Sequence, residues 1–423
     1  MFIDDHNLHL LKSIEDVDEV NSKFYGRFQY PQPPIAFDAP SDPSFETIML
    51  NQSIGSWDHS IIPDRPNIWV AGCGTNQAVY TGLRYPKANV VASDLSPTSI
   101  ATSRSTAKKL GVKNIEFRQE SINQVTYHEE FDYLICTGVI HHNADPSASL
   151  IRLASALKPA GILELMVYNR YHRRETTAFQ KAIRLLADGA DFESELRIAR
   201  KIAEGVKLDN FMVRFLTSLG EISESHLADR LLQPIEYSFT IESLESLLAD
   251  CGLELVAPCI NQFDKDNNTF NWNLEFDDPE VAAIYHSKSD SHRWKISNHL
   301  MMEKSPMLWF YCQRQDSGRR RVSEEKLCER FLELRFTQSK AKRIMYYKLD
   351  DGSYERSARL PAYPGSHPDP VCRKIVEEIA SQPEQSIKDV LRKIGLDINF
   401  SITNKLRLCL TTNAYPYLQS RRG

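Results

Sequence analysis

The chain has 423 residues, and a composition of 42% hydrophobic and 25% charged residues at this length predicts two or three globular domains. The formal net charge of −5 argues against nucleic acid as a partner, because no overall basic field would attract it. The first residues lack the pattern of a signal peptide, and no apolar run reaches the ~18 residues of a membrane span, so we expect a cytoplasmic protein without membrane contact. The 8 cysteines include no Cys-x-x-Cys pair, and we expect them to be free thiols.

Residues 1–60 are expected to form an N-terminal arm. Apolar residues at helical spacing from Leu8 to Val20 predict a helix. The proline-dense stretch Tyr30–Pro34 predicts extended or turn geometry after it.

The stretch 61–170 alternates short apolar runs with helical patterns. Strands this apolar, joined by helical crossovers, predict a parallel sheet covered on both faces. Glu164 lies in the middle of the last run, where a buried charge needs a partner, and we expect it to face a lid residue. The expected strands are 67–71, 88–93, 114–118, 132–136 and 162–168, and the expected helices are 76–84, 96–110 and 147–157.

The pattern changes over 171–237, where apolar residues at helical spacing mix with arginine and lysine. We interpret this piece as a helical insertion that caps the active site. The sheet is expected to resume over 238–316, with a helix ended by Gly252 and an antiparallel strand at Met307–Gln313. The connection 261–305 is predicted to be a second lid or a packed loop.

A separate C-terminal module is expected over 317–423. A hairpin signal at Tyr347–Tyr354 precedes three helical patterns, an order that suggests a small α/β domain of winged-helix type. Since the expected helices lack a basic stripe, docking, dimerisation or lid roles are favoured over DNA reading, which remains the alternative.

A glycine pair marks the turn after the first expected strand. Gly72 and Gly74 allow a sharp turn and a close backbone approach to a ligand, and Asp94 follows the next strand at the spacing of a ribose-binding acid. Thr75, Asn76 and Gln77 follow, so the third glycine of the dinucleotide fingerprint is missing, and no Lys-Ser/Thr pair follows to hold a triphosphate. The loop therefore favours a nucleoside with an amino-acid tail over a pyrophosphate.

At these motifs the sequence resembles the class I S-adenosylmethionine-dependent methyltransferases. The resemblance implies an α/β fold with a seven-stranded Rossmann-like sheet and S-adenosylmethionine as cofactor. The helical cap insertion and the small C-terminal α/β domain would be additions to that core. Some members of this family carry a similar proline-rich N-terminal segment that packs over the cofactor cleft. The proline-rich arm of this chain is expected to do the same, and a plain terminal arm is the alternative. The matching motifs are Val70–Thr75, Ala92–Ser96, Phe117–Ile122, Phe131–Pro146 and Leu157–Met166.

The resemblance also implies a set of cofactor-binding residues. Asp94 would hold the ribose, and Ser121 stands where many members have an aspartate for the adenine, so that Glu120 is the alternative contact. The full expected set is Ala71, Gly72, Gly74, Asp94, Leu95, Glu120, Ser121, Ile122, Thr137 and Gly138.

Candidate catalytic and substrate residues follow two strands. His141 and His142 are usable general bases, although histidines at a helix start also bond to backbone, and Tyr168 is the third catalytic candidate. Asn169, Tyr171 and His172 are expected to hold the substrate, with a solvated start of the cap as the alternative. No metal is expected, because His141, His142 and Asp145 have no further ligand nearby in sequence.

The predicted function is methyl transfer to a small molecule, because a capped pocket suits small substrates. The alternatives are a protein or peptide methyltransferase whose C-terminal module recruits the target, and a cofactor-binding regulator without activity. A homodimer through the cap or the C-terminal domain is a further expectation.

Overall fold

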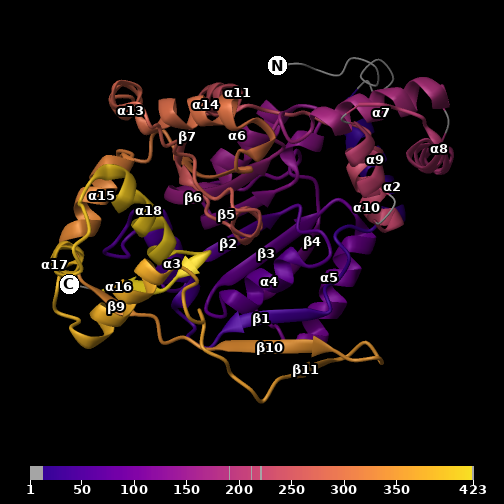
Figure 1. Cartoon of the computed structure of the whole chain (residues 1–423). Coiled ribbons are helices and arrows are strands. Elements are labelled where there is room, and N and C mark those ends of the chain that lie inside the picture. The colour runs from indigo at the N-terminus through magenta and orange to yellow at the C-terminus, as the bar shows by residue number, and fades with distance from the viewer. Residues whose placement is uncertain (1–12, 190, 211, 220–221, 422–423) are drawn as a thin grey trace.

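The computed structural model describes residues 13–189, 191–210, 212–219 and 222–421, and the predicted residues Leu8 and Phe211 lie outside them. The described residues form a seven-stranded sheet at the centre of the molecule, in the order β4-β3-β2-β5-β6-β8-β7 (Figure 1). All neighbouring pairs are parallel except those of β8, which runs antiparallel between β6 and β7. This confirms the predicted sheet and its antiparallel strand. The strands are β2 (Asn67–Ala71), β3 (Asn89–Asp94), β4 (Ile115–Gln119), β5 (Phe131–Thr137), β6 (Leu157–Val167), β7 (Leu253–Pro258) and β8 (Leu308–Arg314).

Helices cover both faces of this sheet. One face packs against α6 (Pro146–Ala156), α11 (Ile241–Asp250) and α14 (Asp290–Met301) in the largest apolar cluster. The other face carries α3 (Phe45–Ser53), α4 (Gln77–Arg84) and α5 (Pro97–Leu110). The caps follow the sequence signals, since Ser96 accepts from the Ser99 amide at the start of α5 and Gly111 ends that helix in the left-handed region.

The two faces of β5, β6 and β8 differ in chemistry. Side chains alternate across a strand, so residues at every second position share a face. On the face toward α6, the central positions are apolar: Leu134, Cys136, Leu163, Leu165, Phe310 and Cys312. On the opposite face, the paired positions are largely polar or aromatic: Tyr133, Thr137, Glu164, Trp309 and Tyr311.

The N-terminal arm is a helix followed by a strand. The helix α2 (Ile14–Arg27) buries Phe24 and, just beyond its end, Phe28 against the cap. The strand β1 (Ala36–Pro40) pairs antiparallel with β10 (Arg343–Lys348), which pairs in turn with β11 (Tyr354–Arg356). The predicted hairpin therefore exists, and it joins the beginning of the chain to its last quarter.

The insertion between β6 and α11 is helical, as predicted, and lies beyond the carboxyl edge of the sheet (Figure 1). The connection 261–305 is also mainly helical and packs on the core through Trp272 and Trp294. The insertion's described helices are α7 (Arg174–Ala187), α8 (Phe192–Gly205), α9 (Met212–Leu219) and α10 (Glu224–Leu231); the connection holds α12 (Gln262–Asp266), α13 (Pro279–His286) and α14.

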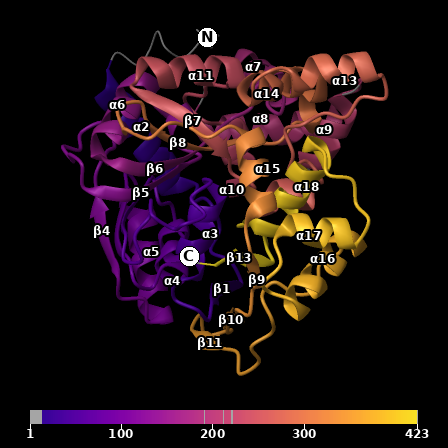
Figure 2. The ribbon, with the colours of Figure 1, turned by 90° about the vertical axis from the view of Figure 1, so that its left-hand side faces the viewer.

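The C-terminal unit, residues 317–421, lies beside the sheet, and its helices form one side of the molecule in Figure 2. It has its own apolar cluster, in which Phe331 and Leu391 are fully buried. Its elements are α15 (Glu324–Glu333), β9 (Phe336–Gln338), β10, β11, α16 (Pro370–Ser381), α17 (Ile387–Lys393), α18 (Phe400–Thr411), β12 (Tyr415–Pro416) and β13 (Leu418–Ser420). In the part of the chain that the structure describes, no helix is long and apolar enough to cross a bilayer.

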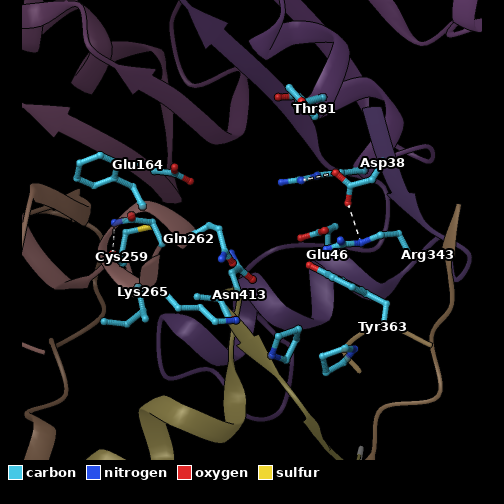
Figure 3. Close-up of a pocket in the computed structure, with 18 of the residues that line it drawn as sticks. Asp38, Glu46, Thr81, Glu164, Cys259, Gln262, Lys265, Arg343, Tyr363 and Asn413 are labelled. Atoms are coloured by element: carbon cyan, nitrogen blue, oxygen red, sulfur yellow. Dashed lines mark hydrogen bonds and ion pairs between the residues drawn. The ribbon is translucent and has the colours of Figure 1, made fainter. Parts of the chain in front are cut away.

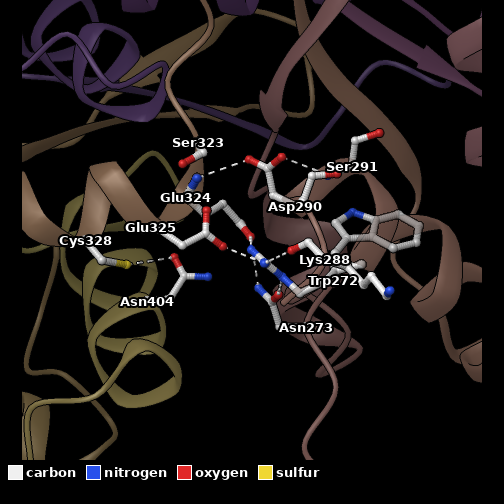
Figure 4. Close-up of polar contacts among 12 residues, drawn as sticks. Trp272, Asn273, Lys288, Asp290, Ser291, Ser323, Glu324, Glu325, Cys328 and Asn404 are labelled. Atoms are coloured by element: carbon white, nitrogen blue, oxygen red, sulfur yellow. Dashed lines mark hydrogen bonds and ion pairs between the residues drawn. The ribbon is translucent and has the colours of Figure 1, made fainter. Parts of the chain in front are cut away.

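Polar contacts connect this unit to the core, and Figure 4 shows Glu324 and Glu325 of the unit close to Asn273 and Lys288 of the core. Arg293 of α14 has a fully buried side chain that forms ion pairs with Glu324 at 3.3 Å and Glu325 at 2.5 Å. It also donates to the Lys288 carbonyl at 2.7 Å and to Asn273 Oδ1 at 3.3 Å. Since Glu324 and Glu325 open α15, these contacts fix the C-terminal unit against the second half of the core.

Candidate functional site

The glycine turn after β2 is shaped by neighbouring backbone. Gly72 and Gly74 have φ angles of 71° and 54°, in the region that favours glycine. The amides of Gly72 and Cys73 both donate to the Ser93 carbonyl at 2.9 Å. A Cβ atom at Gly72 would lie 2.4 Å from Val139 Cγ2, so this close approach of two loops requires glycine.

Asp94 joins this turn to the next helix. Its Oδ2 accepts from the Gly74 amide at 2.8 Å, and its Oδ1 accepts from the Ser96 amide at 2.8 Å. Burial raises the pKa of this carboxyl, while the two amide hydrogen bonds act in the opposite direction. Each oxygen keeps a second lone pair, so the carboxylate can still accept from a hydroxyl of a ligand.

The arm helix α2 reaches the loops that follow three of the strands. Asp18 accepts from the Ser121 hydroxyl and, at 3.2 Å, from Asn123 Nδ2 in the loop after β4. Ser22 donates to the Leu95 carbonyl at 3.1 Å, and Asn21 donates to the His142 carbonyl at 2.8 Å. The sequence analysis missed these arm residues because nothing local distinguishes them from a solvated helix face.

The segment after α2 continues over the glycine turn. The hydroxyl of Thr75 donates to the Pro31 carbonyl, and a Cβ atom at Gly74 would lie 3.2 Å from the Tyr30 carbonyl oxygen. Together with α2, the proline-rich segment contacts the glycine turn and the loops that carry Leu95 and Ser121.

The histidine pair and Tyr168 lie together. The ring centroids of His141 and Tyr168 are 3.7 Å apart with an interplanar angle of 27°, and those of the two histidines are 4.3 Å apart. His142 contacts the Ile235 carbonyl through Nδ1 at 2.8 Å, which holds its ring. His141 is completely buried, and among the described residues neither of its ring nitrogens has a hydrogen-bond partner.

Burial sets the charge of this pair. Desolvation lowers the pKa of His141 well below its usual value, with smaller effects from His142 and Arg173. Desolvation also lowers the pKa of His142, to about 4. Both imidazoles are therefore neutral near pH 7, and within the described residues both ring nitrogens of His141 are without a hydrogen bond.

The cap and the arm add charged groups around Tyr168. The Arg173 guanidinium lies 4.2 Å from the centre of the Tyr168 ring and forms a buried ion pair with Glu236 at 2.5 Å. Asp229 of α10 lies 3.4 Å from the Tyr25 hydroxyl of α2 and accepts from Gln233 at 3.0 Å. Burial raises the pKa of Asp229 to about 7. Sequence reasoning missed Asp229 and Glu236 because the insertion that carries them has no recognisable motif.

Other predicted residues lie apart from this cluster. Asn169 is buried and donates to Ser305 Oγ at 2.7 Å, while His172 contacts the Ser305 carbonyl at 2.8 Å. The Tyr171 hydroxyl contacts His299 at 2.6 Å. The predicted substrate residues thus face the segment 298–306. Glu120 accepts from the Tyr127 hydroxyl through Oε1, and its contact with the adenine stays a prediction.

A cleft of about 1050 Å³ opens between the polar face of the sheet and the C-terminal unit (Figure 3). It begins at the carboxyl edge, where the Thr137 hydroxyl donates to Gln77 Oε1 at 2.8 Å. Its floor includes Glu164, which accepts from the Tyr133 hydroxyl and, at 2.9 Å, from Trp309 Nε1. We expected Glu164 to face a lid residue, but its hydrogen-bond partners are two neutral donors of the sheet itself.

Comparison with known proteins supports a methyltransferase domain. Residues 71–188 match a family model described as "Methyltransferase domain". An uncharacterised protein of Synechococcus sp. is 33% identical over 197 residues, which cover 45% of this chain and 47% of that protein. The ubiquinone biosynthesis O-methyltransferase of Bradyrhizobium sp. is 33% identical over 99 residues, or 23% of this chain and 38% of that enzyme. The chain thus spans less than half the length of these two relatives.

Among solved structures, PKMT2 from Rickettsia typhi in complex with AdoHcy is similar over 89% of this chain and 76% of that chain, with a TM-score of 0.58 and 15% sequence identity. The structure of the same protein described without AdoHcy matches with a TM-score of 0.56. At this identity the likeness shows a shared fold, which extends well beyond the seven-stranded sheet.

Proposed function

Since the family match and the motifs place the chain among the class I S-adenosylmethionine-dependent methyltransferases, we propose that it transfers a methyl group from that cofactor to an amino group of a protein or peptide. The observation that supports a protein or peptide as the methyl acceptor is the cleft beside the sheet. Its volume of about 1050 Å³ lies slightly above the roughly 300–1000 Å³ of small-ligand pockets.

The surroundings of the glycine turn suit the cofactor. The turn needs glycine at position 72, where a Cβ atom would collide with Val139, and Asp94 offers acceptor lone pairs at the position of a ribose-binding acid. Gly72, Gly74 and Asp94 would hold the amino-acid tail and the ribose. Leu95 and the loop of Ser121 would border the adenine, beneath the arm helix α2.

When bound, S-adenosylmethionine supplies an electrophilic methyl group, and the reaction is an in-line displacement at its carbon. An acceptor nitrogen that takes up this methyl group would have to give up a proton. The neutral His141 imidazole accepts this proton at its unpartnered ring nitrogen, and the stacked Tyr168 ring holds the imidazole in place.

Likeness to the Rickettsia protein supports the peptide acceptor. PKMT2 is described as a protein lysine methyltransferase, and the shared fold covers 89% of this chain, including regions outside the sheet. The small-molecule acceptor favoured by the sequence pattern is the second candidate. It is supported by the 33% identity to the ubiquinone biosynthesis O-methyltransferase, which would direct the transfer to an oxygen.

A labelling experiment separates these functions. The chain is incubated with S-adenosylmethionine tritiated in the methyl group and with a lysate that is then divided into protein and small-molecule fractions. We expect label in the protein fraction, as methyl-lysine after acid hydrolysis. Label confined to small molecules would establish the second candidate, and bound cofactor without any transfer would establish the regulator.

Replacing Asp94 with alanine is expected to weaken cofactor binding at least ~10-fold, or about 1.4 kcal/mol. The carboxylate binds the glycine turn and the start of α5, so its loss removes a ligand contact and loosens the turn. Calorimetric titration with S-adenosylhomocysteine measures the change. Asp132→Ala is the matched control, because Asp132 accepts from the Asn67 amide at the opposite edge of the sheet. Equal affinities of Asp94→Ala and the unchanged chain would refute the ribose assignment.

A further inference from the structure

The buried face of the arm helix α2 carries polar side chains where packing alone would favour apolar ones. Asp18 is 7% exposed and Asn21 is 5% exposed, and residues three apart in a helix are neighbours on one face. Val17 and Phe24 of the same helix are buried in apolar clusters, as expected for an arm that packs on the molecule. Because a buried polar group is costly unless its hydrogen bonds are made, the partners of Asp18 and Asn21 indicate what this face contacts.

The hydrogen bonds of these two side chains are incomplete. Asp18 accepts from the Ser121 hydroxyl and, at 3.2 Å, from Asn123 Nδ2, which uses only part of the acceptor capacity of an ionised carboxylate. Asn21 donates from Nδ2 to the His142 carbonyl at 2.8 Å, while its buried Oδ1 has no hydrogen-bond partner within the described residues. This face of α2 therefore presents two neighbouring acceptors, and one of them lacks a donor.

The order of the strands places this face beside one end of the cofactor. β2, β3 and β4 are parallel neighbours in the sheet, so the glycine turn, Asp94 and Ser121 follow one another along its carboxyl edge. On the proposed function, on which this step rests, the amino-acid tail lies at the turn and the ribose at Asp94, so the base lies at Ser121. Asp18 contacts that loop, and Ser22, one turn further along α2, donates to the Leu95 carbonyl at 3.1 Å.

We infer that Asp18 and Asn21 recognise the base of the cofactor by accepting hydrogen bonds from the amino group of its adenine. That amino group has two N–H donors, and the two side chains offer two acceptors. A 6-oxo purine has an acceptor oxygen at the same place, so its lone pairs would face those of the carboxylate. A site built to bind a donor rejects an analogue that lacks it, because the buried acceptors are then left unpaired.

The test is a calorimetric titration of the full chain with two ligands. S-adenosylhomocysteine has an amino group at position 6 of its purine, and S-inosylhomocysteine has an oxygen there. We expect the unchanged chain to bind the first ligand at least ~10-fold more tightly than the second. Neither ligand has a methyl group to transfer, so the measurement is independent of the methyl acceptor.

Asp18→Asn is expected to bring the two affinities within about 3-fold of each other, because its amide can donate to the 6-oxo oxygen. Ser22→Ala is the control for a purely structural role: it loosens the same helix from the Leu95 carbonyl and should lower both affinities by the same factor. Glu19→Gln removes an exposed carboxylate of α2 that pairs with Lys23 at 2.6 Å, and it should change neither affinity. Thermal unfolding identifies any variant that fails to fold.

Two further variants separate the acceptors near the base. Asn21→Ala is expected to reduce the preference for S-adenosylhomocysteine. Glu120→Gln is expected to keep it, because Oε1 of Glu120 already accepts from the Tyr127 hydroxyl. A preference that is lost in Glu120→Gln and kept in folded Asp18→Asn would overturn the inference.

Other results would also overturn it. These are equal affinity of the unchanged chain for the two ligands, binding of neither, or an equal loss of both affinities in Asp18→Asn, which would make Asp18 an anchor of the helix only. Failure of the proposed function is seen in a different experiment. Label confined to small molecules in the lysate would refute the peptide acceptor and leave the preference for adenine unchanged.

Discussion

Replacing His141 with alanine is expected to lower kcat by about 10²–10⁴-fold, the usual contribution of a positioned proton acceptor. The ring is completely buried beside Gly138 and Val139 and stacks on Tyr168, and both of its nitrogens are free of hydrogen bonds in the described structure. Because desolvation keeps it neutral, it can take a proton from the acceptor without first losing one. Single-turnover methylation, with saturating cofactor, measures the change.

Cofactor affinity should stay within about 2-fold of the unchanged chain in His141→Ala, since the ring stacks on Tyr168 and forms no hydrogen bond with the described residues. His142→Gln is the comparison variant, because His142 is held by the Ile235 carbonyl and glutamine can still donate to it. We expect His142→Gln to keep most of the turnover. A His141→Ala variant that is folded, binds cofactor and turns over at the normal rate would exclude His141 as the proton acceptor.

Replacing Arg293 with methionine is expected to lower the free energy of unfolding by about 3–5 kcal/mol, the range for breaking a buried ion pair from one side. Glu324 is only 5% exposed, and Arg407, at 4.0 Å, is its other cation in the described chain. The variant also removes the donors to Lys288 and Asn273 (Figure 4). Denaturant unfolding followed by tryptophan emission measures the loss.

Lys388→Ala is the control for this prediction. Its ion pair with Glu333, at 2.8 Å, lies on the surface of the same C-terminal unit, where such pairs contribute about 0–1 kcal/mol. Adding Glu324→Gln to Arg293→Met should recover part of the loss, because it removes the uncompensated carboxylate. If Arg293→Met unfolded like Lys388→Ala, the buried arginine would not be what fastens the unit.

The spacing of apolar residues and the positions of turn glycines predicted the sheet well, because both signals lie within a few neighbouring residues of the sequence. The runs that became β2, β3 and β5 are short, apolar and bounded by turn signals, and Met307–Gln313 was recognised within one residue of β8. The pairing of β1 with β10 could not be predicted, because it joins residues more than 300 positions apart and β1 is only five residues long.

The candidate site was predicted unevenly for the same reason. Gly72, Gly74 and Asp94 lie within about 25 residues of each other in a recognisable motif, and His141 follows a predicted strand. Asp18, Asn21 and Asp229 come from elements that lack a motif and meet the site only through tertiary packing. The cleft is formed by α3, α4, the sheet and the C-terminal unit, and its polar floor is visible only when the register of β5, β6 and β8 is known.

The three-stranded sheet of β1, β10 and β11 has a consequence for how the chain matures. During synthesis, β1 leaves the ribosome long before β10, so until then it is an edge strand with unpaired amides and carbonyls on that side. The arm that covers the cofactor crevice precedes this strand directly. A nascent chain ending before residue 343 should therefore hold its arm loosely and bind cofactor weakly, and completion of the last quarter is the event that closes the crevice.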